Sequence, residues 1–458
     1  MYKATKIGEN VLDSPKEREK HVITVVGCGR MGLPTACLFS DAGFQVICLD
    51  INPYIVKQIN EGKSPTAEQE LSRLLKENLK KGRVKATTDA KDAIPNSDII
   101  ILTIDTPVDK NRRSDYSNLE ESCRSVGLNL KPGSLLIVQS TLGPYITETL
   151  VKETLETASG LKAGVDFGLA YSPIRASAGR TIRDMTSYQR IVAAVNEQSL
   201  KAAKAVLKTI VKSGLVEVRD IKTAEAIKLF ENVYRDVNIA LANEFAKLCE
   251  KAKIDYIEAQ KAANTQPYCH LLRPGIVSGH IPKDPYILIA EAENLGVKLK
   301  LTALARRVND ETLKHAVNLV KEALRSCEKT LKRSKVAVLG VSFRPNVKEA
   351  KGSLVLELVR LLKKGGAIVS VFDPYFSYKE LKDLGYSAEG TLAKTVEGAD
   401  CLIIPVGHDK FKRLSLRSMG VLMKKPAAIV DLGHVVNPLE AEKQGFVYRG
   451  LGRGVWKE

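Results

Sequence analysis

Three glycines near the N-terminus have a spacing that lets a phosphate approach the backbone. Gly27, Gly29 and Gly32 form G-x-G-x-x-G directly after a β-branched run that is typical of a strand. In a strand–turn–helix unit the first glycine makes the tight turn, and the second lets a pyrophosphate come close. The third lets the helix pack on the strand, which leaves the phosphates at the helix N-terminus. The motif, with Arg30 and Met31 between its glycines, therefore predicts a dinucleotide site.

An acidic residue follows these glycines at the distance that a ribose contact requires. Asp50 ends the second predicted strand, eighteen residues after Gly32. A carboxylate at that place can accept a hydrogen bond from a ribose 2′-hydroxyl, and it would repel the 2′-phosphate of NADP. Together with the glycine motif, Asp50 predicts NAD as the cofactor.

Two threonines lie at the carboxyl ends of two further strands that we predict in the first domain. Thr106 lies at the end of the buried run 97–107, and Thr141 lies near the end of the run 134–144. A doubly wound sheet binds its ligand at the carboxyl ends of its strands, so both hydroxyls are candidates for cofactor contacts. Ordinary turn chemistry is the alternative explanation for both residues.

The stretch 223–250 positions a third set of polar side chains. It contains no Gly or Pro, and its apolar residues recur at steps of three and four, which predicts a helix roughly 40 Å long. Most of its circumference is apolar, so we expect a spine shared by two flanking domains or by two subunits. Lys228, Asn232 and Arg235 share one face and can point into a cleft; a solvated polar stripe is the alternative.

Composition places the chain among soluble globular proteins of two or three domains. It has 458 residues, 44% of them hydrophobic and 27% charged, and no apolar run long enough to cross a membrane. The polar segment 1–20 lacks a signal-peptide core, so we expect a tail and a cytoplasmic location. The eight cysteines form no CxxC pair, which favours reduced thiols and no metal site.

The net charge of +17 permits either nucleic acid or anionic small molecules as partners. The Lys and Arg residues are scattered through helical segments and do not form a basic block with interleaved aromatics. An enzyme of anionic substrates is therefore favoured over a nucleic-acid binder.

The last third of the chain repeats the pattern of the first third. A strand opens at residue 335, a helix is predicted over 353–364, and the next strand ends at Asp373. The run 399–408 then parallels 97–107. This second unit lacks the G-x-G-x-x-G motif, so we expect it to bind something other than the dinucleotide. The fold class is α/β, with two Rossmann-like domains joined by a long central helix and a helical dimerisation region.

Several motifs resemble the UDP-glucose/GDP-mannose dehydrogenase family, and within it the UDP-N-acetyl-D-mannosamine dehydrogenase branch. They are GCGRMGLPTA, KLFENVYRDVNIALANEF, the PG loop ending in IPKDPY, GVSFRPNVKEAKGS, VGHDKF and YRGLGRG. The likeness covers residues 21 to 455. It implies an NAD-dependent enzyme of polysaccharide biosynthesis that oxidises the C6 alcohol of a UDP-sugar in two hydride transfers. It also implies a homodimer built through the helical region. The expected divisions are a tail (1–20), an NAD-binding domain (21–221), a central helical domain (222–328) and a UDP-sugar-binding domain (329–458).

The resemblance also implies roles for individual residues. Lys228 and Asn232 match the pair on the family's central helix, and Asp284 matches the acid of the catalytic loop. His280 aligns with the nucleophile when the loop is matched from its IPKDP side. The substrate-binding set implied in this way is Arg175, Ala176, Arg235, Gln266, Tyr268, Arg344 and Lys351.

The nucleophilic cysteine of the family is missing: His280 replaces it when the loop is matched from its IPKDP side, and it is deleted when the loop is matched on the histidine. The family loop reads Gly-Gly-His-Cys-Ile-Pro, whereas this chain reads Val277-Ser278-Gly279-His280 before Ile-Pro. The acid that assists the water step in the family is Ile174 here. An imidazole does not form a stable equivalent of a thioester, so we expect turnover to stop after one hydride transfer or to be very slow at the second step.

Three functions fit these observations. The first is a nucleotide-sugar dehydrogenase acting on a UDP-N-acetylhexosamine, stopped or slowed after one hydride transfer. The second is a single reversible oxidation of a secondary hydroxyl that yields a keto-sugar or an epimer. The third is a non-catalytic protein that binds a nucleotide sugar.

Overall fold

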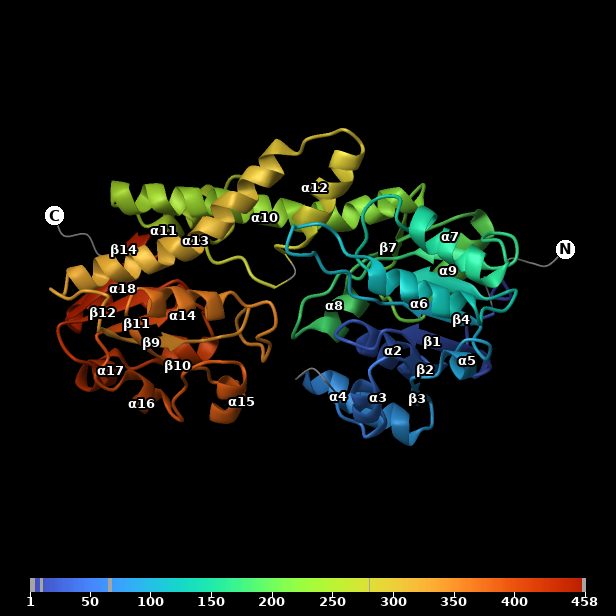
Figure 1. Ribbon diagram of the computed structural model, residues 1–458, viewed down its shortest axis with the longest axis horizontal. Coiled ribbons are helices and arrows are strands. Elements are labelled where there is room, and N and C mark those ends of the chain that lie inside the picture. Colours follow the sequence, from blue (N-terminus) through green and yellow to red (C-terminus); the bar gives the residue numbers. More distant parts are fainter. Residues whose placement is uncertain (1–4, 9–10, 65–67, 280, 455–458) are drawn as a thin grey trace. The chain divides into compact units, whose positions relative to one another are not determined.

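The protein divides into two compact units in its computed structural model, which describes residues 5–8, 11–64, 68–279 and 281–454. The first unit comprises residues 1–231 and 286–298, and the second comprises 232–285 and 299–458. Each unit contains one largely parallel sheet (Figure 1), so the predicted α/β fold with two Rossmann-like domains is confirmed. The predicted domain boundaries remain a prediction.

The first unit is built on an eight-stranded sheet of order β3-β2-β1-β4-β5-β6-β7-β8. All neighbours pair in parallel except β6 and β7, which are antiparallel. The order reverses between β1 and β4, and in a doubly wound sheet this is the place where ligands bind. The strands are β1 (Val22–Val26), β2 (Gln45–Leu49), β3 (Val84–Thr87), β4 (Ile99–Leu102), β5 (Leu135–Val138), β6 (Gly168–Tyr171), β7 (Arg190–Ala194) and β8 (Leu215–Glu217).

Helices cover both faces of this sheet and form two apolar cores. One core joins α2 (Gly32–Asp41), α4 (Gln69–Lys80), α8 (Thr181–Ser187) and α9 (Glu197–Lys208) to the strands. The other core contains α5 (Ala90–Ala93), α6 (Ser117–Gly127) and α7 (Lys152–Ser159). Further helices of this unit are α1 (Pro15–Arg18), α3 (Pro53–Asn60) and the π-helix η1 (Thr147–Val151). Ile7 and Leu12 are buried in the first core, so the described part of the expected tail packs on this domain.

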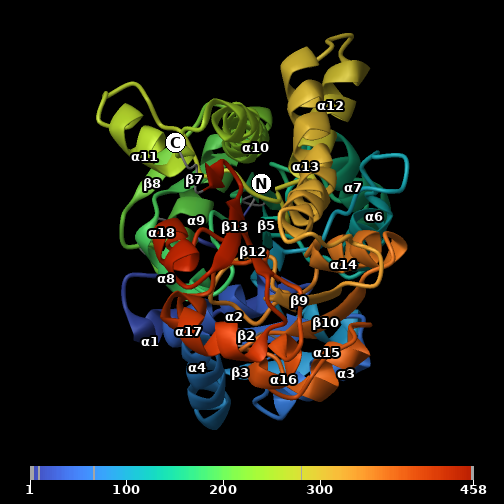
Figure 2. The same cartoon turned by 90° about the vertical axis from the view of Figure 1, so that its left-hand side faces the viewer.

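The second unit holds a six-stranded sheet of order β10-β9-β11-β12-β13-β14, in which only the β13–β14 pair is antiparallel. The helix α13 (Lys300–Arg325) and α14 (Val355–Lys364) cover one face; α16 (Leu392–Val396), α17 (Leu416–Leu422) and α18 (Pro438–Lys443) cover the other (Figure 2). Two further helical segments are α15 (Tyr378–Asp383) and η2 (Asp409–Arg413). The strands are β9 (Lys335–Leu339), β10 (Ile368–Phe372), β11 (Cys401–Ile404), β12 (Ala427–Asp431), β13 (Phe446–Gly450) and β14 (Arg453–Gly454).

The two sheets begin with the same turn, as the internal repeat predicts. Gly27 after β1 and Gly340 after β9 both have positive φ, 86° and 97°. Each turn is held by the acid that follows the neighbouring strand, since Asp50 accepts the backbone N–H of Cys28 and Asp373 accepts that of Val341, both at 2.8 Å.

The long helix α10 runs from Ile221 to Ala252 and confirms the helix predicted over 223–250. It ends because Lys253 adopts a left-handed φ of 56°, and the N–H of Ile254 bonds the carbonyl of Cys249 at 2.9 Å. Two other helices lie near it in the sequence, α11 (Tyr256–Ala263) and α12 (Asp284–Asn294). Among the described helices, none combines the length and the hydropathy needed to cross a membrane.

The segment 167–185 has the composition of a loop, but it contains β6 and the start of α8. The strand has only four residues and begins with Gly168, so it lacks the length and the β-branched composition that identify a strand. The helix starts at Arg180 without a side-chain hydrogen bond at its N-cap, so no start signal marks it.

Candidate functional site

The three glycines of the first turn are used in different ways. A Cβ on Gly32 would lie 1.9 Å from the carbonyl oxygen of Gly27, so the helix can approach the strand only without one. A Cβ on Gly29 would meet nothing within 4 Å, so its backbone faces open space. This pattern fits a pyrophosphate at the N-terminus of α2, with close packing at two glycines and access at the third.

Asp50 is held rigidly at the end of β2. Its Oδ2 accepts the N–H of Cys28 at 2.8 Å, and its Oδ1 accepts the N–H of Asn52 at 2.9 Å. The side chain is 8% exposed. Each carboxylate oxygen keeps a further lone pair, so the residue can still accept a ribose hydroxyl. The residues present therefore fit the predicted cofactor, NAD.

The two predicted threonines lie in contact. The hydroxyl of Thr106 donates to the carbonyl oxygen of Thr141 at 2.6 Å, which ties the segments after β4 and β5 together. Sequence reasoning missed Thr103, whose hydroxyl donates to the carbonyl of Gly27 at 2.6 Å and closes the glycine turn. Its position at the end of β4 was the available signal.

The segment after β6 carries Arg175 and Ala176, which are both half-buried. Arg175 is engaged within the protein, since it pairs with Glu231 at 2.6 Å and donates to the carbonyl of Gln189 at 2.9 Å. Ile174, where the family has an acid, is buried in an apolar core.

A second guanidinium near this segment was not predicted. Arg190 is 2% exposed and donates through Nε to the hydroxyl of Ser172 at 3.3 Å. Burial lowers the pKa of Arg190 to about 10. No carboxylate among the described residues pairs with it.

The predicted catalytic residues on α10 and α12 are partly brought together. The side-chain amide of Asn232 donates to Oδ2 of Asp284 at 2.5 Å, and Asp284 is 1% exposed in the first turn of α12. Lys228 precedes Asn232 by one helical turn and is half-buried, whereas Arg235 is exposed. His280 lies outside the described residues.

A pocket of about 380 Å³ lies in the second unit, where the loop before α12 meets the ends of β9, β11 and β12. Three cationic side chains, Arg273, Arg344 and Lys412, line it together with one acid, Asp409. This excess of positive charge suits a diphosphate. Its other lining residues are Pro274, Gly275, Ile276, Ser278, Ser342, Phe343, Pro345, Val355, Pro405, Val406, Gly407, Leu432, Gly433 and His434.

The sequence predicted only Arg344 among the cations of this pocket. Arg273 stands directly before the Pro-Gly of the quoted loop and Lys412 follows the VGHDKF motif by one residue, so both motifs held a signal. His434 lines the pocket as a neutral ring, because burial lowers its pKa to about 4 and its Nε2 donates to the carbonyl of Leu451 at 3.1 Å.

Of the seven predicted substrate-binding residues, all of which the structure describes, Arg344 alone lines this pocket. Lys351 is exposed, and its backbone N–H bonds the side chain of Glu349 at 3.0 Å. Gln266 caps a local turn by accepting the N–H of Tyr268 at 2.7 Å, and Tyr268 is 92% exposed. Their substrate role remains a prediction. Cys269, in the same segment, directs its thiol to the side chain of Asn264 at 3.7 Å.

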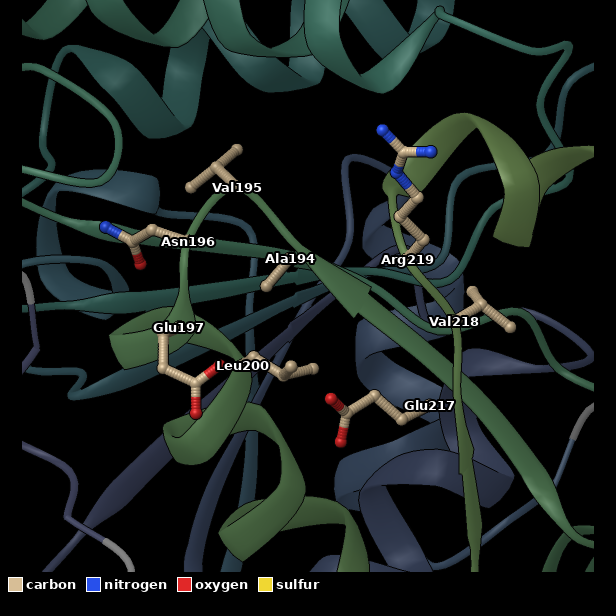
Figure 3. Close-up of a pocket in the computed structure, with 8 residues that line it drawn as sticks. All are labelled: Ala194, Val195, Asn196, Glu197, Leu200, Glu217, Val218 and Arg219. Atoms are coloured by element: carbon tan, nitrogen blue, oxygen red, sulfur yellow. The ribbon is translucent and has the colours of Figure 1, made fainter.

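Another pocket, of about 390 Å³, lies in the first unit at the ends of β7 and β8 and the start of α9 (Figure 3). Because β7 is antiparallel to β6, its carboxyl end lies at the opposite end of the strands from the glycine turn. This pocket therefore lies at that opposite end. Glu197, Glu217 and Arg219 line it, and Glu217 pairs with Lys204 at 2.7 Å. It contains none of the predicted site residues.

Comparisons with known proteins cover most of the chain. Sequence profiles described as the UDP-glucose/GDP-mannose dehydrogenase family match in three parts: the NAD binding domain over residues 21–211, the central domain over 222–311 and the UDP binding domain over 337–438. The cationic pocket lies largely within the third match.

Individual relatives agree with these profiles. UDP-N-acetyl-D-mannosamine dehydrogenase of Pyrococcus horikoshii is 35% identical over 94% of this chain and 99% of its own length. The enzyme of the same name from Methanocaldococcus jannaschii is 33% identical over 94% and 96%. Among solved structures, the Pyrococcus horikoshii UDP-D-ManNAc dehydrogenase has a TM-score of 0.86 at 34% identity, covering 94% of this chain and 99% of that one. An NDP-N-acetyl-D-galactosaminuronic acid dehydrogenase from Methanosarcina mazei has a TM-score of 0.81 at 32% identity, covering 99% and 98%.

Proposed function

Because the chain belongs to the UDP-glucose/GDP-mannose dehydrogenase family, we propose that it is an NAD-dependent oxidoreductase acting on a CH–OH group of a UDP-N-acetylhexosamine. Relatives named as dehydrogenases of UDP-N-acetyl-D-mannosamine and of UDP-N-acetyl-D-glucosamine support this sugar class. The predicted resemblance to the family is thereby confirmed.

The observation that carries the proposal is the cationic pocket of the second unit. Arg273, Arg344 and Lys412 give it the charge that a diphosphate needs, and it lies in the domain matched by the UDP binding profile. The glycine turn with Asp50 provides a separate dinucleotide site. Two distinct nucleotide sites are what an NAD-dependent reaction on a nucleotide sugar requires.

The polar residues of α10 and α12 would handle the proton and the developing charge. Oxidation of an alcohol removes a hydride from carbon and a proton from oxygen, and NAD, when bound, supplies the hydride acceptor. Lys228 would take the hydroxyl proton or stabilise the alkoxide. Asp284 holds the Asn232 amide through its 2.5 Å contact, so that this amide can position the sugar hydroxyl or a water.

We further propose that turnover stops, or becomes very slow, after the first hydride transfer. The second oxidation in this family passes through a thioester, and position 280 is His instead of Cys. The acid that would assist hydrolysis is Ile174, which is buried in an apolar core. The enzyme would therefore release an aldehyde or its hydrate.

The stoichiometry of the reaction tests this proposal. We expect about one NADH per sugar when UDP-N-acetylmannosamine or UDP-N-acetylglucosamine is exhausted, since one hydride leaves per alcohol oxidised. Mass spectrometry should then find the aldehyde or its hydrate. A uronic acid formed with two NADH per sugar would refute the one-step proposal and leave the dehydrogenase assignment intact.

The same replacement supports a second candidate, a single reversible oxidation of a secondary hydroxyl. Lys228 or His280 would act as the base, and the product would be a keto-sugar or, after reduction, an epimer. Conversion of one UDP-sugar into another without net NADH would favour this candidate. Calorimetry that detects binding of NAD and UDP-sugars with no absorbance change at 340 nm would instead favour a non-catalytic binding protein.

A homodimer built through α10 is part of the proposal. Tyr234, Leu241, Phe245 and Leu248 recur on one face of this helix and are 58%, 39%, 38% and 64% exposed in the single chain. On α13, Leu301 and Leu304 are also exposed. An apolar surface of this kind is typical of a subunit interface. Light scattering should give twice the chain mass; a monomer that persists at high protein concentration would contradict the dimer.

A further inference from the structure

The buried side-chain amide of Asn243 hydrogen-bonds the loop that lines the cationic pocket. Asn243, which lies in α10 and is fully buried, accepts the backbone N–H of Gly275 through Oδ1 at 2.8 Å. Its Nδ2 donates to the carbonyl oxygen of the same residue at 3.2 Å. The side chain therefore satisfies both backbone groups of Gly275, as a neighbouring β-strand would.

This contact falls in the middle of a segment that has no regular structure. Between the end of α11 at Ala263 and the start of α12 at Asp284, the described backbone forms neither helix nor strand. Tyr256 fixes one side of the segment by donating to the carbonyl of Leu272 at 2.7 Å. Gly279 fixes the other side through its N–H, which bonds the carbonyl of Gly352 at 2.9 Å.

The residues around the Asn243 contact are those that line the pocket. Arg273, Pro274, Gly275 and Ile276 follow one another along its wall. Arg273 contributes a positive charge to the pocket, and it lies two residues before Gly275 in the chain. A shift of the loop at Gly275 would therefore move Arg273 relative to Arg344 and Lys412, which come from other parts of the second unit.

A second buried amide fixes the orientation of the first. Nδ2 of Asn309, on α13, donates to the carbonyl and to Oδ1 of Asp236, both at 2.9 Å. Oδ1 of Asn309 is thus left to accept from Nδ2 of Asn243 at 2.9 Å. Asp236 is itself paired with the buried Arg306 at 2.6 Å.

This hydrogen-bond network requires a side chain at position 243 that has both a donor and an acceptor. Nδ2 of Asn243 faces two oxygens, the carbonyl of Gly275 and Oδ1 of Asn309, whereas its Oδ1 faces an N–H. A carboxylate has the same shape but no donor, so it would face both oxygens with like partial charge in a buried place.

We propose that Asn243 is a positioning residue for the diphosphate pocket, setting the place of the Arg273–Gly275 wall and hence the affinity for the UDP group. The inference rests on the proposed function in that it takes this pocket as the nucleotide-sugar site. Asn243 acts through the loop and takes no part in the chemical step, so its effect falls on binding and on KM more than on kcat.

Calorimetric titration of the full-length protein with UDP tests the proposal. Asn243→Asp should weaken UDP binding about tenfold or more, because a buried hydrogen-bonded donor is lost. Binding of NAD, titrated separately, should stay within about twofold because its predicted site is built from other residues. A general loss of structure would instead lower both affinities together with the thermal midpoint.

Asn238→Asp is the matched control. Asn238 lies in the same helix, is half-buried, and its side chain makes no hydrogen bond among the described residues. This variant should keep UDP affinity within about twofold, because it changes charge without changing the loop contact. Asn243→Ser, which keeps a small donor and acceptor, should bind UDP more tightly than Asn243→Asp.

The outcomes separate the inference from the function on which it rests. If folded Asn243→Asp binds UDP as tightly as the unaltered protein, the positioning role is overturned while the enzyme proposal stands. If the unaltered protein binds no UDP, both are overturned. Tight UDP binding without any turnover would leave the positioning role in place and remove only the catalytic proposal.

Discussion

The side-chain amide of Asn232 lies 2.5 Å from the carboxylate of Asp284, which is almost completely buried. The two residues are 52 positions apart, and Asp284 lies in the first turn of α12. A carboxylate in the first turn of a helix is stabilised by the free N–H groups there. The charge of Asp284 can therefore persist in a buried place and hold a neutral amide in one orientation.

Asp284→Asn should slow the chemical step strongly. The introduced amide keeps one oxygen, but it is a neutral and weaker acceptor and can turn its NH2 toward Asn232. The Asn232 amide is then held less firmly, and we expect kcat to fall about 10²-fold with UDP and NAD affinities nearly unchanged. Steady-state kinetics together with separate binding titrations would measure both. Asp383→Asn, at an exposed position in α15, serves as the control and should retain activity. A kcat within about threefold of the unaltered enzyme would remove Asp284 from the proposed mechanism.

Asp50→Asn should weaken NAD binding about tenfold and narrow the preference for NAD over NADP. The charge that repels a 2′-phosphate is lost, while one side-chain oxygen remains to accept a backbone N–H. Asp373→Asn is a matched control, because Asp373 makes the same two kinds of backbone contact, to Val341 and Tyr375 at 2.8 Å each. It should leave NAD affinity unchanged. Equal effects of both variants would show that the change in NAD binding reflects structure alone.

Some of these features follow directly from the sequence, because their determinants are local. The glycine turn and Asp50 depend on residues within one strand–turn–helix unit, and α10 depends on an uninterrupted apolar periodicity. The strand predicted over 97–107 shrinks to Ile99–Leu102, since the sheet pairs only that part. Arg273 and Lys412 could not be placed together from the sequence, because 139 positions separate them and only the folded second unit brings both to one pocket.

Restoring a thiol at position 280 should restore part of the second oxidation. In His280→Cys the residue before Ile-Pro becomes the family's nucleophile, which can form the thiohemiacetal that loses a second hydride. The NADH formed per sugar should rise from about one toward two, measured at 340 nm with the sugar limiting. His280→Ala, which supplies no nucleophile, should remain near one. If His280→Cys also stays near one, the missing thiol is not what limits turnover.

Glu225 should make the stability of the first unit depend on pH. Burial raises the pKa of this carboxyl to about 8 from its ordinary value of 4.5, although the N–H and hydroxyl of Thr147 and the N–H of Tyr145 bond it. Between those two values the folded state keeps a proton that the unfolded state has lost. The free energy of unfolding therefore falls as the pH rises through this range.

Glu225→Gln cannot ionise, so it should lose this part of the pH dependence. Urea unfolding at several pH values between 5 and 8 would give the slope of the unfolding free energy against pH for this variant and for the unaltered protein. A constant loss at the Tyr145 and Thr147 contacts would shift the curve of the variant without changing its slope. Glu217→Gln, at a carboxyl outside this buried site, is the control and should keep the slope of the unaltered protein. Parallel curves for Glu225→Gln and the unaltered protein would mean that Glu225 is ionised in the folded state over the whole range.

Gly433→Ala should damage the cationic pocket through its backbone. A Cβ on Gly433 would lie 2.6 Å from the backbone nitrogen of Gly407, and both glycines line the pocket. The ends of β11 and β12 would have to separate, at a cost of about 1–3 kcal/mol in stability, and UDP affinity should fall with them. Gly390→Ala is the control, because a Cβ there meets nothing within 4 Å. Thermal unfolding and UDP titration of both variants would measure the losses in stability and affinity. A Gly433→Ala protein as stable as the control would show that the ends of β11 and β12 can move apart freely.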